Sequence, residues 1–217
     1  MGKFVVVALF TLAVSCGSDE PLSDYEAAVT ESLDQEVERR LIYDIEVGDS
    51  RSEFFAYARE ENRKQHFLGG SGMTIHTRVG DDYFERPGDL EFFPIFREDT
   101  IIGVRGTLSF DSWSPTKPET HAEAILAKTL PFFESFTPGT GFVAFEGTPR
   151  PTYFKLHANL RTAVFPRGLQ EIAFETIDMR SVGPEIRSGQ DLREPDDPYF
   201  EFSRALQKVK AQSGVEE

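Results

Sequence analysis

Two short motifs in the sequence match sites of known chemistry, but each lacks a part that its chemistry requires. His121-Ala122-Glu123 matches the first half of the zinc-deaminase signature, in which the histidine ligates the metal and the glutamate moves protons. The second half, Pro-Cys-x-x-Cys, is absent, since the only cysteine is Cys16. Residues 139–144 match Gly-x-Gly-x-x-Ala, but a dinucleotide loop must follow a strand and open a helix. A helix is predicted before these glycines and a strand after them, which favours a simple turn.

No other motif in the sequence predicts a catalytic centre. The chain has no Gly-x-Ser-x-Gly elbow, Walker loop, His-Glu-x-x-His or calcium-binding loop. Its four histidines are scattered along the chain, at positions 66, 76, 121 and 157. The sequence therefore predicts no catalytic residue, no metal and no cofactor. A hydrolase whose site is assembled from dispersed residues remains the alternative.

One strand is predicted to present a row of polar side chains. Between residues 154 and 164, apolar and polar residues alternate, and alternate residues of a strand face opposite sides of a sheet. Lys155, His157, Asn159 and Arg161 would then share one face. If this face lines a groove, it is a candidate site for a polar or anionic ligand. An ordinary solvent-exposed sheet face is the other interpretation.

A second candidate surface lies on the strand predicted over residues 90–97. Leu90 and Phe92 would face one side of the sheet, while Phe93 and Ile95 would face the other, so both sides are apolar. We name Phe92, Phe93 and Ile95 as a candidate patch for a protein partner or a lipid. Cover by the N-terminal helices is the alternative.

The elements that position these residues predict an α+β fold. One helical stripe is predicted at four-residue steps by Tyr25, Val29, Leu33, Val37 and Leu41, and Ser50 with Glu53 forms a capping box for a second helix. A hairpin is predicted about Glu98-Asp99, a third helix is expected to bend or end at Pro131, and residues 181–196 read as a polar loop. Strands that follow each other without an intervening helix favour an antiparallel sheet, here of about six to seven strands.

The predicted organisation is one α+β domain over residues 25–217. Its helical part covers residues 25–68, its sheet-rich part residues 73–180, and its C-terminal helix residues 197–211. In the last helix, Asp197 is the predicted N-cap and Pro198 takes the first helical position. No long low-complexity linker divides this region.

Charge and cysteine content exclude several classes of function. The 217 residues contain 37 acidic and 23 basic side chains, a net charge of −14, and no basic run. Such a surface repels phosphate backbones, so nucleic acid is not an expected partner. A single cysteine cannot form an intrachain disulfide or a site with two thiolates.

The first sixteen residues have the anatomy of an export signal. Lys3 is followed by an apolar run over residues 4–14, which is too short to span a bilayer, and then by Ser15 and Cys16. Leu12-Ala13-Val14-Ser15-Cys16 resembles the lipobox of bacterial lipoproteins. The resemblance implies cleavage before Cys16, acylation of that cysteine, and a tether over residues 16–24. Because Ala13-Val14-Ser15 also fits ordinary signal cleavage, a soluble exported protein is the alternative.

These observations predict an exported lipoprotein anchored to the membrane through Cys16. Gly17 after the cysteine resembles the default for the outer membrane, facing the periplasm. The expected activity is non-enzymatic: a binding or envelope-assembly module that acts on an envelope protein or a small molecule. An anchored or periplasmic hydrolase is the alternative.

Overall fold

A computed structural model describes residues 24–64, 74–79, 87–110, 114, 116–148 and 150–193. Cys16 and the helix predicted over residues 197–211 lie outside the described residues. The described helices are α1 (Asp24–Leu33), α2 (Arg51–Lys64), the 3₁₀ turn η1 (Pro118–Thr120), α3 (Ala122–Phe136), α4 (Pro184–Arg187) and α5 (Gln190–Arg193).

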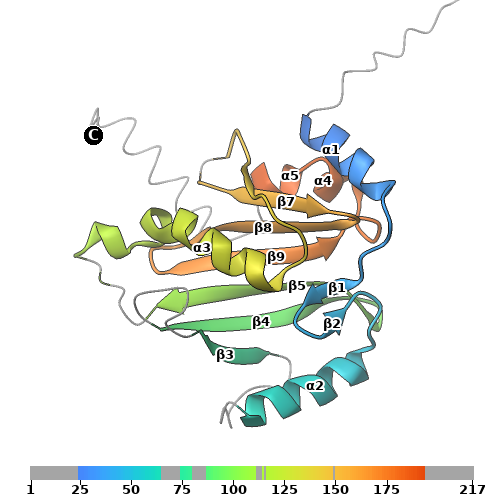
Figure 1. The fold of residues 1–217 in the computed structure, drawn as a ribbon, viewed down its shortest axis with the longest axis horizontal. Coiled ribbons are helices and arrows are strands. Elements are labelled where there is room, and N and C mark those ends of the chain that lie inside the picture. Colours follow the sequence, from blue (N-terminus) through green and yellow to red (C-terminus); the bar gives the residue numbers. More distant parts are fainter. Residues whose placement is uncertain are drawn as a thin grey trace, which may run out of the picture.

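The centre of the fold is a seven-stranded antiparallel sheet in the order β3-β4-β5-β9-β8-β7-β6, with a small β1-β2 hairpin beside it (Figure 1). The predicted α+β class with an antiparallel sheet is confirmed. The strands are β1 (Arg40–Ile42), β2 (Ile45–Glu46), β3 (Ile75–Val79), β4 (Gly88–Arg97), β5 (Thr100–Phe110), β6 (Val143–Ala144), β7 (Tyr153–His157), β8 (Leu160–Arg167) and β9 (Glu171–Asp178).

One face of the sheet, here called the α3 face, is closed by an apolar core. Helix α3 crosses this face over β8 and β9, and α2 lies beside β3 (Figure 1). Phe92 of β4, Phe174 of β9 and Phe133 of α3 are all almost fully buried in one cluster, and the rings of Phe133 and Phe174 are 5.3 Å apart. This cluster also takes in Leu41 and Ile42 of β1, so the small hairpin completes the cover.

The other face, here called the α1 face, is covered over only part of its width. A smaller cluster joins Tyr25 of α1 and Leu192 of α5 to Ala163 of β8 and Ile177 of β9. The strands β7, β8 and β9 therefore have helices on this side. The segment of β5 next to them carries exposed Arg105 on the same face.

Several local predictions are confirmed. The backbone N–H of Ser50 donates to Glu53 at 2.8 Å and that of Glu53 donates to Ser50 Oγ at 3.3 Å, which is a capping box at the start of α2. The predicted hairpin joins β4 and β5 through Glu98-Asp99. Gly139 and Gly141 have φ of 78° and 82° in a turn that enters β6, so the Gly-x-Gly-x-x-Ala segment is a turn and not a dinucleotide loop.

Two predicted elements are wrong, and a third expectation, at Pro131, is wrong in part. The first helix ends at Leu33, and Leu41 lies in strand β1, because the β1-β2 hairpin buries Leu41 and Ile42 in the main core. Of the two outcomes expected at Pro131, a bend or an end of the helix, the end is wrong: α3 continues to Phe136, since Phe132, Phe133 and Phe136 are buried against the sheet. The segment read as a polar loop contains α4 and α5, and Leu192 of α5 is buried.

The strand predicted over residues 154–164 is also wrong, and this changes the candidate ligand face. The chain turns at Ala158-Asn159, so that β7 pairs with β8 and Lys155 lies opposite Thr162. Lys155 therefore faces the α3 side, whereas Arg161, opposite Leu156, faces the α1 side. The two-residue turn at Ala158-Asn159 shifts the alternation of sides by which residues 154–164 were assigned to faces. The four polar residues therefore do not share one face of the sheet.

Candidate functional site

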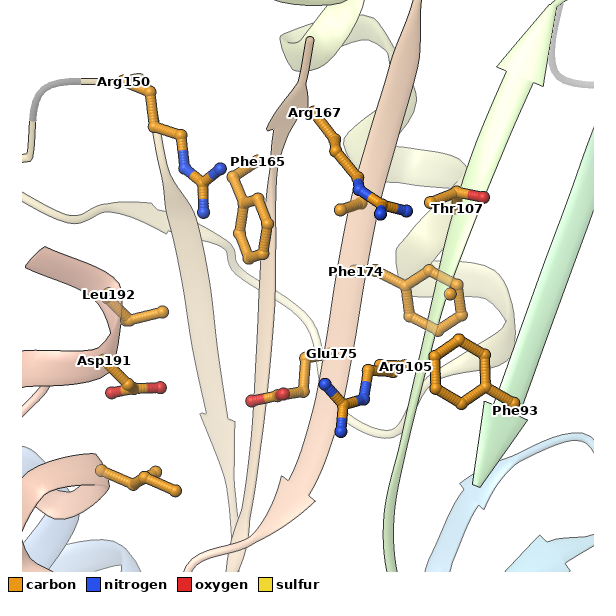
Figure 2. Close-up of a pocket in the computed structure, with 13 residues that line it drawn as sticks. Phe93, Arg105, Thr107, Arg150, Phe165, Arg167, Phe174, Glu175, Asp191 and Leu192 are labelled. Atoms are coloured by element: carbon orange, nitrogen blue, oxygen red, sulfur yellow. The ribbon is translucent and has the colours of Figure 1, made fainter. Parts of the chain in front are cut away.

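A pocket of about 390 Å³ lies on the α1 face, beside the part that the helices cover (Figure 2). Two neighbouring strands contribute small side chains to the floor of the pocket, where Thr107 of β5 lies opposite Ala173 of β9. The lining comes from β4, β5, β8, β9, the segment before β7, and α4–α5. The lining residues are Phe93, Arg105, Gly106, Thr107, Arg150, Phe165, Arg167, Ala173, Phe174, Glu175, Ile186, Asp191 and Leu192.

Two phenylalanine rings of the lining each have an arginine beside them. The guanidinium carbon of Arg105 lies 5.4 Å from the centre of the Phe93 ring, and that of Arg150 lies 3.9 Å from the centre of the Phe165 ring. Figure 2 shows the two pairs on opposite sides of the hollow. Arg150 is buried and its Nη1 donates to the Pro166 carbonyl at 3.4 Å, whereas Arg105 is exposed at the pocket.

The third arginine of the lining, Arg167, comes from the end of β8. Its Nη1 lies 3.8 Å from Glu171 of β9, in a partly exposed ion pair. Arg105 differs, because among the described residues its guanidinium is within 4.0 Å of no carboxylate, although Glu175 is its direct neighbour across the β5–β9 ladder. Glu175 is held instead by another arginine.

That arginine is Arg161, which is fully buried behind the pocket. Its Nη2 lies 2.8 Å from Glu175 and 2.6 Å from Asp191, and its Nη1 donates to the second Asp191 oxygen at 3.0 Å. Nη1 also lies 3.3 Å from the Tyr25 hydroxyl and 3.4 Å from the Ile186 carbonyl, while Nε is buried without a hydrogen-bond partner in the described part of the chain. Arg161 thus fixes both carboxylates that line the pocket.

The electrostatics of this network keep its charges in place. Burial alone would lower the pKa of Arg161, but Tyr25, Asp191 and Glu175 together raise that pKa above its ordinary value, so the guanidinium stays charged. The pKa of the Tyr25 hydroxyl is raised, chiefly by burial and against the effect of Arg161. Asp191 and Glu175 consequently neutralise Arg161 rather than the exposed Arg105.

Three of the four residues of the predicted ligand face are buried and hydrogen-bonded within the fold. Lys155 is 2% exposed and its Nζ donates to the carbonyls of Gly139 at 2.6 Å and Thr137 at 3.2 Å. Asn159 is buried and donates to Asp178 at 2.7 Å, and its own oxygen accepts from the Glu38 backbone at 2.7 Å.

Arg161, the third of these residues, stands next to the pocket, as described above, but does not line it. His157 is exposed, 3.7 Å from Glu38. The structure therefore does not bring the four predicted residues together.

The predicted patch on β4 is divided between the two faces of the sheet. Phe92 is 0% exposed in the main core, Ile95 packs against the smaller core, and Phe93 is 39% exposed at the pocket. Of the three, Phe93 alone is both exposed and part of the candidate site.

The residues that sequence reasoning missed are the pocket's charged groups: Arg105, Arg150, Arg167, Glu175 and Asp191. A hairpin was predicted about Glu98-Asp99, but the residues beside Arg105 depend on the pairing of β5 with β9, far along the chain. No local pattern marked Asp191, because its segment read as a loop. Finding this site from the sequence would have required knowing that β5 lies next to β9 in the sheet.

The described residues contain neither a metal-binding group nor a membrane-spanning helix. In this part of the chain, no three histidine, cysteine, aspartate or glutamate side chains are grouped so that they could hold a metal ion. None of the described helices is long and apolar enough to cross a membrane.

Comparisons with known proteins give no relative for this chain. No protein-family model, no curated protein and no solved structure matches it. Function must therefore be inferred from the site itself.

Proposed function

We propose that this protein is an exported, membrane-anchored binding module that takes a small anionic ligand in the pocket on the α1 face. The observation that supports the proposal is the group of three arginines, Arg105, Arg150 and Arg167, around a cavity of about 390 Å³. A cavity with apolar walls and a few polar groups directed into it is typical of a small-molecule site.

The charge of the pocket contrasts with that of the whole chain. The chain has a net charge of −14, which disfavours anions near an average part of the surface. Within the pocket, the two carboxylates are bound to buried Arg161, which leaves Arg105 without a carboxylate partner among the described residues. An anionic ligand supplies the missing partner.

Binding fits this pocket better than hydrolysis does. Acid–base catalysis needs a group that can exchange a proton with the substrate, and the most common such group is an imidazole. The lining within the described residues includes no histidine or cysteine, and its two carboxylates are ion-paired to Arg161. The pocket offers donors that hold an anion, without a base that would activate water.

Thermal unfolding in citrate tests the proposal. At constant ionic strength, citrate should raise the Tm of the protein above its value in chloride, because a ligand that binds only the folded state stabilises it. The rise should fall by at least about half in Arg105→Ala/Arg167→Ala, since a charge-assisted hydrogen bond contributes about 1.5–3 kcal/mol.

The matched control is Arg39→Ala/Arg59→Ala, which also removes two exposed cations, neither of which lines the pocket. It should keep the full citrate effect. Citrate also stabilises proteins by exclusion from their surface, and that part should be equal in all three proteins. An equal rise in all three would overturn the proposed site.

The anchor is tested separately, in a bacterial host. The mature protein should begin at Cys16, carry acyl mass and stay with the membrane fraction, and Cys16→Ser should release it, because two or more acyl chains are needed for stable anchoring. The proposed location is the outer membrane, facing the periplasm. An unacylated product that begins at Cys16 would contradict the lipoprotein assignment and leave the soluble exported form.

A further inference from the structure

Arg105 and Phe93, side by side at the pocket, point to a narrower ligand class: we infer that the ligand is an aromatic anion, a flat ring system that carries a carboxylate, sulfonate or phosphate group. This inference rests on the proposed function, because it assumes that the pocket binds an anion. It adds that the ligand must be aromatic as well as charged.

The first observation is the position of the Arg105 guanidinium beside an exposed ring. Its guanidinium carbon lies 5.4 Å from the centre of the Phe93 ring, and the side chain is exposed at the pocket. The planar guanidinium can donate two parallel hydrogen bonds to an oxyanion. An aromatic ring attached to that oxyanion then lies within reach of Phe93. The Arg105–Phe93 pair is thus suited to an anionic group and the ring next to it.

The second observation is the size of the space between the pairs. Phe93 is on β4 and Phe165 on β8, and β5 and β9 lie between these strands, so that three strand spacings of roughly 4.8 Å separate them. The floor over that distance is low, because it is formed by Thr107 and Ala173. A simple inorganic anion fills little of a cavity of about 390 Å³. A molecule of two or three rings covers the floor and reaches an arginine at the wall.

The third observation is the exposure of the apolar walls. Phe93 is 39% exposed although it is a large apolar side chain beside a charged one. A purely ionic site needs no such ring, and a purely apolar site needs no arginine on it. The combination favours a ligand that has both properties in one molecule.

Two fluorescent probes that differ in one group provide the test. 8-Anilinonaphthalene-1-sulfonate carries a sulfonate on the same aromatic skeleton as N-phenyl-1-naphthylamine, which is neutral. The full protein should bind the sulfonate at least about tenfold more tightly than the neutral probe, because a hydrogen bond to a charged group contributes about 1.5–3 kcal/mol. The net negative charge of the chain disfavours the sulfonate, so tighter binding of the sulfonate must come from the arginines of the pocket.

Variants show where the probe binds and which property matters. Arg105→Ala should weaken the sulfonate about tenfold and leave the neutral probe unchanged, whereas Phe93→Ala should weaken both probes. The control is Arg40→Ala, at a second cavity of about 330 Å³ that is lined by Tyr43, Phe132, Ser135 and Phe136. It should change neither affinity, and a loss of sulfonate binding there would overturn the assignment of the ligand class to this pocket.

The two proposals fail in different ways. If citrate stabilises the protein through Arg105 and Arg167 but the sulfonate probe binds no more tightly than inorganic sulfate, the pocket is an anion site and the aromatic class is wrong. If both probes bind equally, and Arg105→Ala changes neither, the aromatic class is again overturned. If citrate has no effect that depends on the arginines and the sulfonate is not preferred, the proposed function itself is overturned.

Discussion

The two faces of the central sheet are made by the same strands but have opposite roles. On β5 and β9, Val104 and Phe174 face α3 and are buried in the main core, while Arg105 and Glu175, their immediate neighbours in sequence, face the other side. The α3 face is closed by α2, α3 and the β1–β2 hairpin. The α1 face is closed only where Arg161 and the helices α1, α4 and α5 meet, and it is hollow beside them.

The difference shows how one sheet separates stability from recognition. Close-packed apolar residues on the α3 face contribute most of the burial that stabilises the fold. The α1 face can then keep charged groups near water, because the fold does not depend on closing that face completely. The buried ion pairs of Arg161 are the exception, since they lie on the α1 face and yet are part of its structure. Four predictions test this division, from the largest effect to the smallest.

Removal of Arg161 should have the largest effect. Arg161→Met leaves Glu175 and Asp191 without their partner, and truncating one side of a buried ion pair costs about 3–5 kcal/mol. Urea unfolding at pH 7 measures the loss. Adding Glu175→Gln and Asp191→Asn to Arg161→Met should recover much of it, because no unpaired charge then remains.

A small effect of Arg161→Met, below about 1 kcal/mol, would contradict the structural role that we assign to Arg161. A large effect that the triple variant does not reduce would mean that its packing matters and its charge does not. In that case the ion pairs with Arg161 would not be what holds Glu175 and Asp191 at the pocket.

Two adjacent phenylalanines of β4 test the comparison of the faces directly. Phe92→Ala should lower the free energy of unfolding by about 3–5 kcal/mol, because the ring is 0% exposed in the main core. Phe93→Ala should lower it by less than about 1 kcal/mol, since Phe93 is 39% exposed. Each variant is the control for the other, and equal losses would mean that the α1 face is as closed as the α3 face.

The sequence predicted most of the fold because its signals there are local. The Ser50–Glu53 capping box, the turn at Glu98-Asp99 and the alternation along β4 each depend on residues close together in the chain. They predicted α2, the β4–β5 hairpin and the opposite directions of Phe92 and Phe93. The alternation was misread only where a two-residue turn at Ala158-Asn159 is hidden within it.

The site could not be predicted because its residues are joined by long-range pairing. Arg105 and Glu175 are neighbours across β5 and β9, yet they are separated by α3 and three strands in the sequence. Arg161 was predicted as one of four residues on a polar strand face, and that pattern suggested exposure. Its burial follows from Asp191 and Tyr25, which approach it from α5 and α1.

Lys155 provides a prediction on the α3 face with a distinctive pH dependence. Burial lowers the pKa of Lys155 to about 8, partly opposed by Glu134, whereas an unfolded lysine has a pKa near 10.4. Between these values the unfolded chain binds more protons than the folded one, so this group makes the protein more stable as pH rises from about 8 to about 10.5. Below pH 8 the full cost of the buried charge is present.

Urea unfolding of the protein and of Lys155→Met, at several pH values from 7 to 10.5, measures this contribution. The free energy of unfolding of the unchanged protein should rise relative to that of the variant by roughly 2–3 kcal/mol over the range, at 1.36 kcal/mol for each unit of pKa shift. Because tyrosines and other lysines titrate in both proteins, their contributions cancel in the difference. If the two curves of unfolding free energy against pH are parallel, the pKa of Lys155 is the same in the folded and the unfolded protein, and the prediction is wrong.

The smallest effect on stability is expected at Arg105, the residue that we place at the centre of ligand binding. Arg105→Ala should change the free energy of unfolding by less than about 0.5 kcal/mol, because the side chain is exposed and its described contact is with the ring of Phe93. The same variant should lose much of its preference for the anionic probe. In this respect Arg105 differs from Arg161, because loss of Arg161 should lower the stability of the fold as well as disturb the site. A loss above about 1 kcal/mol at Arg105 would mean that the arginines at the pocket stabilise the fold, and the division between the two faces would no longer hold.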